Sequence, residues 1–177
     1  MKLGVVGLGS IAEFHLICFA KLGWHFQVIV CRKDNKNYAR LNESFVFAQV
    51  VQPDSFEPRE YEVDAWLILT PPEVALEYVE KLGDAVPILV EKPVSMEPRR
   101  IDLFLETHSG ENVRVAYNRR FYPFVDNLLT MVSEVDRGVY VRTSIPESSK
   151  NGLLHNFMYN SVHVLDLVQF LLGGVDI

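Results

Sequence analysis

Short apolar segments alternate with helix-like segments through the first 118 residues, and few folds accommodate that alternation. The apolar segments are residues 2–7, 26–31, 47–51, 65–70, 86–91 and 113–118. The segments of helical character between them are 10–23, 35–43, 71–83 and 96–108. Strands that are apolar on both faces and alternate with helices form a parallel sheet covered on both sides. We therefore predict a doubly wound α/β domain over residues 1–120.

The pattern changes after residue 120. Residues 122–138 and 155–174 have helical periodicity, whereas 139–145 alternates apolar and polar side chains as an antiparallel strand does. One helix–strand–helix segment is too small to close a core of its own. We therefore predict that residues 121–177 belong to a second, α+β domain and that the sequence stops inside it.

The first predicted helix and the two cysteines suggest which side chains are buried. Within 10–23, the residues Ile11, Phe14, Cys18 and Leu22 share one helical face. Cys18 and Cys31 both lie in apolar segments, without a CxxC motif or a histidine at metal-ligand spacing. We expect two buried, reduced thiols, a cytoplasmic protein and no metal site.

The charge and the hydropathy of the sequence argue against nucleic-acid and membrane partners. The net charge is −6, and the basic pairs Arg99–Arg100 and Arg119–Arg120 are too small for a phosphate-binding face. We therefore expect no nucleic-acid partner. The N-terminal apolar run is short and interrupted by glycine, unlike a signal peptide. No stretch reaches the roughly 18 apolar residues of a membrane span, so we expect no membrane partner.

The first predicted strand ends in the sequence GLGSIA. Gly7 permits a tight turn, Gly9 lets a pyrophosphate approach the backbone, and Ala12 lets the next helix pack closely on the strand. Ser10 and Ile11 lie at the helix N-terminus, whose amides attract phosphate. The alternative is a tight turn that is rich in glycine but binds nothing. Because this GxGxxA turn joins a strand to a helix at the start of a βαβ unit, we predict a dinucleotide-binding, Rossmann-type domain.

The end of the second predicted strand bears on which dinucleotide binds. An Asp or Glu at this point would bind the ribose hydroxyls of NAD. This sequence has Cys31, Arg32 and Lys33 there, and Asp34 follows one position later. A guanidinium and an ammonium suit a 2′-phosphate, so we predict NADP as the cofactor and Arg32 as a ligand of its phosphate. The alternative is NAD, with Arg32 and Lys33 solvated and Asp34 reaching back to the ribose.

The fifth predicted strand ends in Glu91, Lys92 and Pro93, within the sequence LVEKP. Ligands of open α/β sheets bind at the carboxyl ends of the strands, where this stretch lies. A lysine in a dry pocket or beside a cation has a lowered pKa, which suits acid–base chemistry. The alternative is that Glu91 and Lys92 form a surface ion pair.

Five stretches occur in an order that is found in a known family. They are GLGSIAEFH, DAWLILTPP, LVEKP, YNRRFYP and HVLDLVQFLLG, which together reach across nearly all of residues 1–174. They resemble the glucose–fructose oxidoreductase / inositol dehydrogenase / MocA family of NAD(P)-dependent sugar and polyol oxidoreductases. The glycine turn of that family is often followed by a histidine, here His15. The combination of LVEKP with NRRF about 25 residues later is the most specific part of the resemblance.

The resemblance implies roles for several residues. Lys92 would hold the substrate oxygen and assist proton transfer, Glu91 would orient the lysine, and a cis peptide would precede Pro93. His163 would be the second proton-transfer residue, and Arg120 would be a substrate contact or an ion-pair partner. The implied cofactor contacts beyond the glycine turn and Arg32 are Thr70, Pro71, Glu91, Lys92, Asn118 and Arg119. A sugar, cyclitol or nucleotide-sugar substrate is implied, as is a homo-oligomer once the second domain is complete.

The sequence departs from the family pattern at two positions. An Asp normally stands four residues before the motif histidine, but Tyr159 stands there, and Ala75 replaces a family histidine near the cofactor. Either Tyr159 shares proton transfer with His163 and Lys92, or it packs in the core and the chemistry is weakened. Asp166 would support His163 or the helix packing. The predicted function is therefore an oxidoreductase, with a non-catalytic dinucleotide sensor or partner-binding protein as the alternative.

Overall fold

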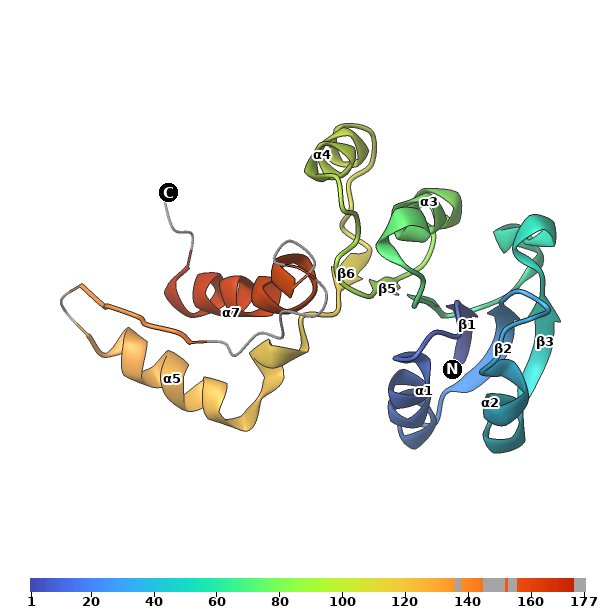
Figure 1. Ribbon diagram of the computed structural model, residues 1–177, viewed down its shortest axis with the longest axis horizontal. Helices are drawn as coiled ribbons and strands as arrows, with labels where there is room; N and C mark the ends of the chain where they lie inside the picture. The colour runs from blue at the N-terminus through green and yellow to red at the C-terminus, as the bar shows by residue number, and fades with distance from the viewer. Residues whose placement is uncertain (136–137, 145–151, 153–155, 174–177) are drawn as a thin grey trace. The chain divides into compact units, whose positions relative to one another are not determined.

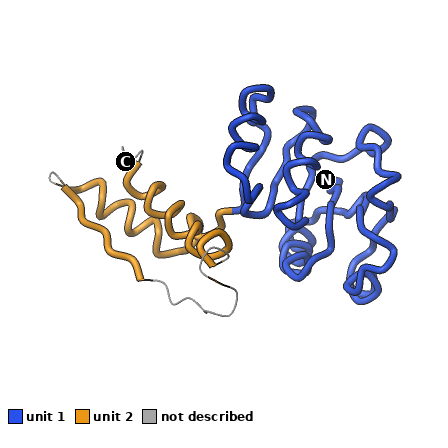
Figure 2. Tube along the Cα trace, turned by 45° about the horizontal axis from the view of Figure 1, so that its top comes forward, with its two compact units in different colours: residues 1–116 blue, residues 117–177 orange. Residues whose placement is uncertain are grey.

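The computed structural model describes residues 1–135, 138–144, 152 and 156–173, which form two compact units. Unit 1 comprises residues 1–116 and unit 2 residues 117–177 (Figure 2). The boundary falls at Ala116, directly after the last strand of unit 1.

Unit 1 is built on a six-stranded parallel sheet with the strand order β3-β2-β1-β4-β5-β6. The strands are β1 Lys2–Val6, β2 His25–Val30, β3 Phe47–Val51, β4 Ala65–Ile68, β5 Ile88–Val90 and β6 Val113–Val115. The order runs outward in one direction from β1 and in the other from β4, so the chain switches direction between these two neighbours. The loops that follow β1 and β4 therefore diverge, which opens a crevice at the carboxyl edge of the sheet.

Four helices cover the two faces of this sheet (Figure 1). They are α1 Ala12–Lys21, α2 Tyr38–Ser44, α3 Pro72–Leu82 and α4 Pro98–Thr107. The first two pack on one face, and α3 and α4 pack on the other. Both α3 and α4 begin with proline, which tolerates the first helical position because its missing amide would have no partner there. Two short 3₁₀ turns, η1 Pro53–Ser55 and η2 Pro58–Glu60, connect β3 to β4.

The four inner strands send side chains into two separate hydrophobic cores, one on each face of the sheet, as a sheet covered on both faces requires. The core under α3 and α4 contains Val6, Val28, Val30, Trp66, Ile68, Ile88, Val90, Ala75, Leu76, Val79 and Phe104. The core under α1 and α2 contains Leu3, Val5, Phe26, Ile29, Leu67, Ala12, Leu16 and Leu41. The doubly wound fold predicted from the sequence is confirmed.

The prediction that α1 presents Ile11, Phe14, Cys18 and Leu22 as its packing face is wrong. Those side chains are exposed, and Phe14 is 67% exposed. The helix instead buries Ala12 and Leu16 against the sheet. The small side chain of Ala12 allows the helix to approach the strand closely, and that approach sets the rotation of the whole helix. Of the two cysteines, which are both free thiols, Cys31 is buried as expected but Cys18 is exposed.

Unit 2 contains the 3₁₀ turn η3 Asn118–Phe121, the helix α5 Pro123–Ser133, the π-helical turn η5 Phe157–Ser161 and the helix α7 Val162–Leu172. The predicted strand at 139–145 is not found over its described residues 139–144, because they have no neighbouring strand to pair with in the described part of unit 2. The helix predicted over residues 155–174 begins at His155 and ends at Gly174, and both of these residues lie outside the described ones.

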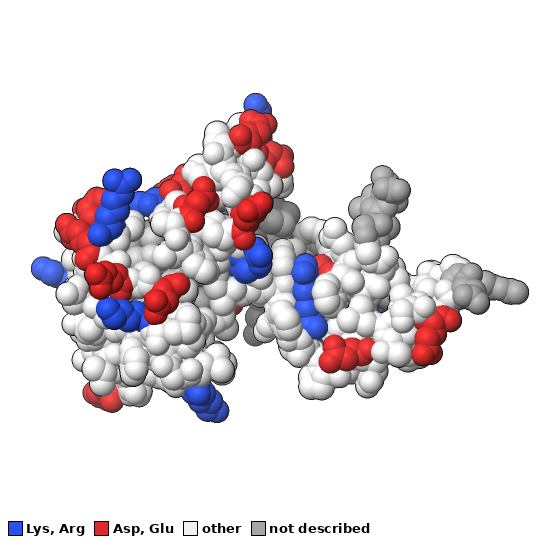
Figure 3. Space-filling model, turned by 180° about the vertical axis from the view of Figure 1, so that it is seen from behind, with Lys and Arg blue, Asp and Glu red and all other residues white. Residues whose placement is uncertain are grey.

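On the face of unit 1 that Figure 3 shows, Lys and Arg side chains are interspersed with Asp and Glu side chains, so neither sign of charge dominates this face. Among the described residues, no helix is both long enough and apolar enough to cross a membrane.

Candidate functional site

A cleft of 510 Å³ opens at the carboxyl edge of the sheet, at the switch point between β1 and β4. Its walls come from the ends of β1, β2 and β4 and from the first turns of α3. The lining residues are Val6, Gly7, Leu8, Gly9, Val30, Cys31, Arg32, Asn35, Pro53, Leu69, Thr70, Pro71, Glu73, Val74 and Tyr78. Five predicted cofactor residues, Gly7, Gly9, Arg32, Thr70 and Pro71, are among them.

Gly7 makes the turn out of β1 and could not be replaced by another residue without strain. Its φ is +93°, which side chains with a Cβ rarely adopt. A Cβ on Gly7 would lie 2.9 Å from the backbone carbon and oxygen of Leu69. The amide of Gly7 donates to the carbonyl of Val30 at 2.9 Å, and Leu69 donates to Val6 at 2.8 Å. The glycine turn is therefore held against both neighbouring strands.

Gly9 differs from Gly7 because the fold itself does not require glycine there. A Cβ on Gly9 would meet the carbonyl oxygen of Leu69 at 3.6 Å, an ordinary contact. Gly9 and the next two residues, Ser10 and Ile11, are exposed, and α1 begins directly after them. Ser10 and Ile11 do not line the cleft, whereas Ala12 is fully buried. The space above Gly9 is therefore open to a ligand at the N-terminus of α1.

The end of β2 contributes a cation to the cleft but no carboxylate. Arg32 lines the cleft and is 77% exposed, while Cys31 beside it is buried, which raises the pKa of its thiol. Arg32 Nε lies 3.6 Å from Asp34 Oδ1, and Asp34 is 80% exposed and does not line the cleft. Lys33 does not line it either. An ion pair this exposed contributes little energy, so the guanidinium can exchange Asp34 for another anion.

The end of β4 contributes a hydroxyl. Thr70 Oγ1 is buried and makes no hydrogen bond with any of the described residues. Buried hydroxyls normally have a partner, and an exception of this kind points to a ligand or a water molecule. Pro71 follows in the same wall. Together with the glycine turn, this wall fits a dinucleotide, whose pyrophosphate and riboses carry many hydrogen-bonding oxygens.

Helix α3 supplies lining residues that the sequence reading missed. Val74 and Tyr78 lie four residues apart and therefore face the cleft together. This i, i+4 spacing after the Thr-Pro turn was the signal that could have found them. Ala75, which stands where the family often has histidine, is instead fully buried in the core.

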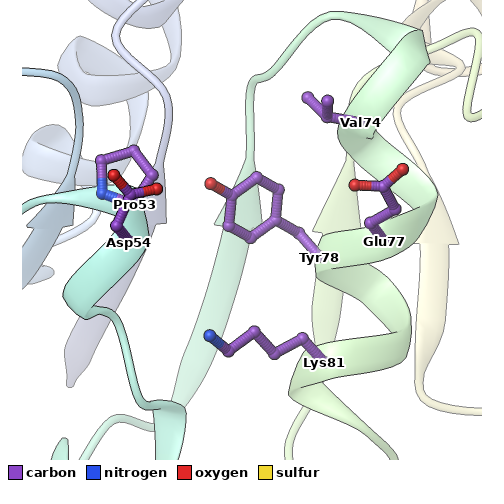
Figure 4. A pocket seen from close by; sticks show the side chains of 6 residues that line it. All are labelled: Pro53, Asp54, Val74, Glu77, Tyr78 and Lys81. Carbon is purple, nitrogen blue, oxygen red and sulfur yellow. The ribbon is translucent and has the colours of Figure 1, made fainter.

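A smaller pocket of 240 Å³ adjoins the cleft and shares Pro53, Val74 and Tyr78 with it. Figure 4 shows the Tyr78 ring directed from α3 toward Pro53 and Asp54. Burial raises the pKa of the Tyr78 phenol, and the nearby charges of Asp54 and Glu77 raise it further. The phenol therefore stays protonated and can donate a hydrogen bond at this end of the cleft.

The segment after β5 holds Lys92 through its neighbour Glu91. The amide of Glu91 donates to Ile68 on β4 at 2.9 Å, and its Oε2 accepts the amide hydrogen of Lys92 at 3.1 Å. Its Oε1 lies 2.7 Å from Nε2 of His15, which belongs to α1. The peptide between Lys92 and Pro93 is cis, as the family resemblance implied. Neither Glu91 nor Lys92 lines the cleft, and Lys92 is half-buried.

In unit 2, the motif histidine His163 is buried at the start of α7, and its ring meets Tyr117 edge-to-face at 6.0 Å between centroids. Asp166 is also buried on α7. Its carboxylate accepts two hydrogen bonds from Arg120, one of them from Nε at 2.8 Å and the other from the terminal NH2 group. The Arg120 guanidinium also lies over the ring of Phe170, 5.1 Å from its centroid. Arg120 is therefore an ion-pair partner that fastens α7 to η3.

Tyr159 lies in the π-helical turn that precedes α7. A π-turn contains more residues than an α-turn, so residues four apart come closer to one face than they do in an α-helix. Tyr159 and His163 are four apart, and the Tyr159 side chain is half-buried. Asn160 is exposed. The local backbone thus favours Tyr159 over Asn160 as the neighbour of His163.

The remaining predicted residues are divided between the units. Asn118 and Arg119 lie in η3 at the start of unit 2, together with the proton-transfer candidates His163 and Tyr159, whereas Lys92 lies in unit 1. Among the described residues, no group of three or more His, Cys, Asp or Glu side chains is arranged to hold a metal ion.

Comparison with known proteins agrees with this geometry. The model of an oxidoreductase family with an NAD-binding Rossmann fold, GFO_IDH_MocA, matches residues 1–119. A comparison with curated protein sequences found no match.

Solved structures with the same fold include a myo-inositol dehydrogenase from Corynebacterium glutamicum, with a TM-score of 0.74 and 21% identity over 97% of this chain and 54% of that one. Another is scyllo-inositol dehydrogenase from Lactobacillus casei, with a TM-score of 0.72 and 16% identity over 98% and 55% of the two chains. A third is the WlbA dehydrogenase from Thermus thermophilus in complex with NAD and UDP-GlcNAcA, with a TM-score of 0.72 and 19% identity over 97% and 62%. The present chain thus spans little more than half the length of these proteins.

The family match covers the glycine turn, the cleft and the segment that carries Lys92, which are the parts of the site described in unit 1. The chain belongs to the glucose–fructose oxidoreductase / inositol dehydrogenase / MocA family of oxidoreductases with an NAD-binding Rossmann fold.

Proposed function

We propose that this chain is an NADP-preferring oxidoreductase that acts on a hydroxyl or ketone of a sugar, cyclitol or nucleotide sugar. The observation that carries the proposal is the cleft at the switch point, which the glycine turn and Thr70 both line. Thr70 and Lys92 each stand two residues beyond the end of neighbouring strands, β4 and β5. A candidate acid–base residue therefore lies on the same edge of the sheet as the binding cleft.

The residues of the cleft fit the parts of a dinucleotide. Gly9 and the N-terminal amides of α1 would hold the pyrophosphate, since the backbone there is open and the helix dipole favours an anion. Thr70 would hydrogen-bond to a ribose or phosphate oxygen. Pro71 and Val74 would flank the adenosine half, with the Tyr78 phenol as a donor at its far end. The bound cofactor supplies the hydride acceptor or donor.

The preference for NADP rests on Arg32. It lines the cleft at the end of β2, where the NAD-specific enzymes of this fold carry an acidic residue. A guanidinium can bind a phosphate through two parallel hydrogen bonds. Asp34 is the competing anion, but its contact with Arg32 is exposed and long.

Proton transfer would be carried by Lys92, with His163 and Tyr159 from unit 2. The Lys92 ammonium would hold the substrate oxygen and exchange a proton with it as the carbinol and carbonyl interconvert. Tyr159 would supply a hydroxyl in place of the missing carboxylate, because a phenol can donate a proton and can orient a sugar hydroxyl. Asn118 and Arg119 would contact the cofactor or the substrate.

The first experiment is a fluorescence titration of the chain with NADPH and NADH. We expect saturable binding of both, with NADPH tighter by about tenfold, which corresponds to about 1.4 kcal/mol. The variant Arg32→Ala should lose this preference while it binds NADH as before. Lys36→Ala removes an exposed cation that does not line the cleft and serves as the matched control. Tighter binding of NADH to the unmodified chain would contradict the NADP preference.

The second experiment tests turnover with a panel of polyols and nucleotide sugars. Lys92→Ala should abolish turnover and leave dinucleotide binding unchanged. Tight dinucleotide binding without turnover of any compound in the panel would favour the non-catalytic sensor. If a folded sample bound neither dinucleotide, the proposed function would be wrong for this chain.

A further inference from the structure

His15 lies on α1, three residues after the buried Ala12, and its ring reaches the segment that follows β5. Its Nε2 lies 2.7 Å from Glu91 Oε1. A carboxylate can only accept hydrogen bonds, so the ring nitrogen is the donor. The two residues are 76 positions apart in the sequence. This contact joins the helix that begins at the glycine turn to the segment that carries Lys92.

The contact is better shielded from water than the other ion pairs of unit 1. The side chains of His15 and Glu91 are 19% and 17% exposed. The pair formed by Arg40 and Glu13, whose acidic partner is also on α1, is 53% and 39% exposed at a similar distance of 2.7 Å. Because water screens exposed pairs, the His15–Glu91 contact is less weakened by screening than the Arg40–Glu13 pair.

Glu91 uses both carboxylate oxygens and its own amide. Oε1 accepts from His15, Oε2 accepts from the Lys92 amide, and the Glu91 amide donates to Ile68 on β4. The carboxylate therefore cannot rotate without breaking a contact. The carboxylate thus links the His15 ring to the Lys92 amide.

We propose that His15 is a positioning residue, which acts through Glu91 to fix the Lys92 backbone relative to the glycine turn. The inference rests on the proposed function for the role of Lys92, and it extends that function by linking the cofactor-binding turn to the acid–base segment. Any shift of α1 on dinucleotide binding is transmitted to Lys92 through this contact. A contact that only stabilised the fold would leave the Lys92 backbone where it is when His15 is replaced.

The test measures hydrogen exchange at the Lys92 amide by mass spectrometry or NMR, in the full chain. His15→Ala should speed exchange at this amide by roughly tenfold, because the Glu91 carboxylate, which accepts the amide hydrogen, is no longer held by the His15 ring. His15→Gln should restore slow exchange, since its side-chain amide can donate to Glu91. Glu13→Gln removes the charge from a comparable α1 contact with Arg40 and should leave Lys92 exchange unchanged. Unchanged exchange in His15→Ala, or equal acceleration in Glu13→Gln, would overturn the proposal.

A second variant and a kinetic readout keep the test decisive. If His15→Ala does not fold, Glu91→Ala replaces it, because alanine has no acceptor oxygen and should also release the Lys92 amide. In an active sample, His15→Ala should lower kcat by roughly tenfold with the dinucleotide Kd unchanged, and His15→Gln should recover kcat. An equal loss of dinucleotide affinity would contradict a positioning role. If the unmodified chain binds no dinucleotide, the proposed function fails, while the exchange comparison still decides whether His15 controls Lys92.

Discussion

Two glycines of the same turn have different reasons to be glycine. Gly7 has a positive φ and would bring a Cβ to 2.9 Å from the Leu69 backbone, so the fold requires it. Gly9 has neither constraint, and its lack of a side chain leaves space above the backbone. The fold therefore accounts for the first glycine, and the proposed binding of a dinucleotide would account for the second.

Replacing each glycine by alanine should separate the two effects. We expect Gly7→Ala to lower the free energy of unfolding by about 3 kcal/mol, from backbone strain and the clash with Leu69. Gly9→Ala should change that free energy by no more than about 1 kcal/mol, yet weaken NADPH binding by at least about tenfold. Urea unfolding and the fluorescence titration measure the two quantities. Full binding by Gly9→Ala would show that no ligand approaches this backbone.

At the scale of elements, α7 is fastened to the start of unit 2 by Arg120, Asp166 and Tyr117. Burial raises the pKa of the Tyr117 phenol, the charge of Asp166 raises it further, and Arg120 lowers it in part. The hydrogen bonds that Arg120 donates to the Asp166 carboxylate raise the pKa of its guanidinium. The ion pair thus stays charged while the phenol beside it stays neutral.

This arrangement predicts a loss of stability at alkaline pH. The pKa of Tyr117 in the folded chain lies above its unfolded value of about 10, so its contribution is complete below that pH and is lost as the pH rises through the folded value. Tyr117→Phe should remove this loss. Urea unfolding of both proteins below and above about pH 10 measures the difference. Parallel pH profiles for the two proteins would show that the phenol does not titrate at this contact.

The sequence predicted the strands and helices of unit 1 but not the rotation of α1. Periodicity identified a helix, but its buried face was determined by the close approach of Ala12, which is a property of the assembled sheet. The strand predicted at 139–145 had the right alternation, but a strand also needs a partner. A pattern within one segment contains neither kind of information.

Only part of the candidate site was predicted, because some of its contacts also depend on how the segments are assembled. The glycine turn, Arg32 and Lys92 follow strand ends, and parallel strands bring their carboxyl ends to one edge, so the sequence could place them together. The contact of His15 with Glu91 spans 76 positions and depends on how α1 lies beside β5. The resemblance drew attention to His15 but gave it no partner.

At the scale of the whole molecule, unit 2 exposes large apolar side chains. Phe121 is 84% exposed and Met131 64%, and Phe124 and Met131 lie seven residues apart on one face of α5. Exposed apolar side chains gathered on one face favour association. We therefore predict that the chain self-associates through unit 2.

Sedimentation velocity tests this prediction. The weight-average sedimentation coefficient should rise with protein concentration, and the double variant Phe124→Ser with Met131→Ser should suppress the rise. Val46 is 89% exposed in unit 1 and gives the matched control, because Val46→Ser removes an exposed apolar side chain elsewhere. A coefficient that is independent of concentration in the unmodified chain would rule out this association.

A π-helical turn, Phe157–Ser161, comes directly before α7. The number of residues in this turn therefore determines which side chain lies one helical turn before His163. Such a turn accommodates one residue more than the α-helix that follows it. Losing one residue there would let α7 extend backward without interruption and would turn every earlier side chain to a new direction. An insertion or deletion in this turn would therefore change which side chain stands four residues before His163.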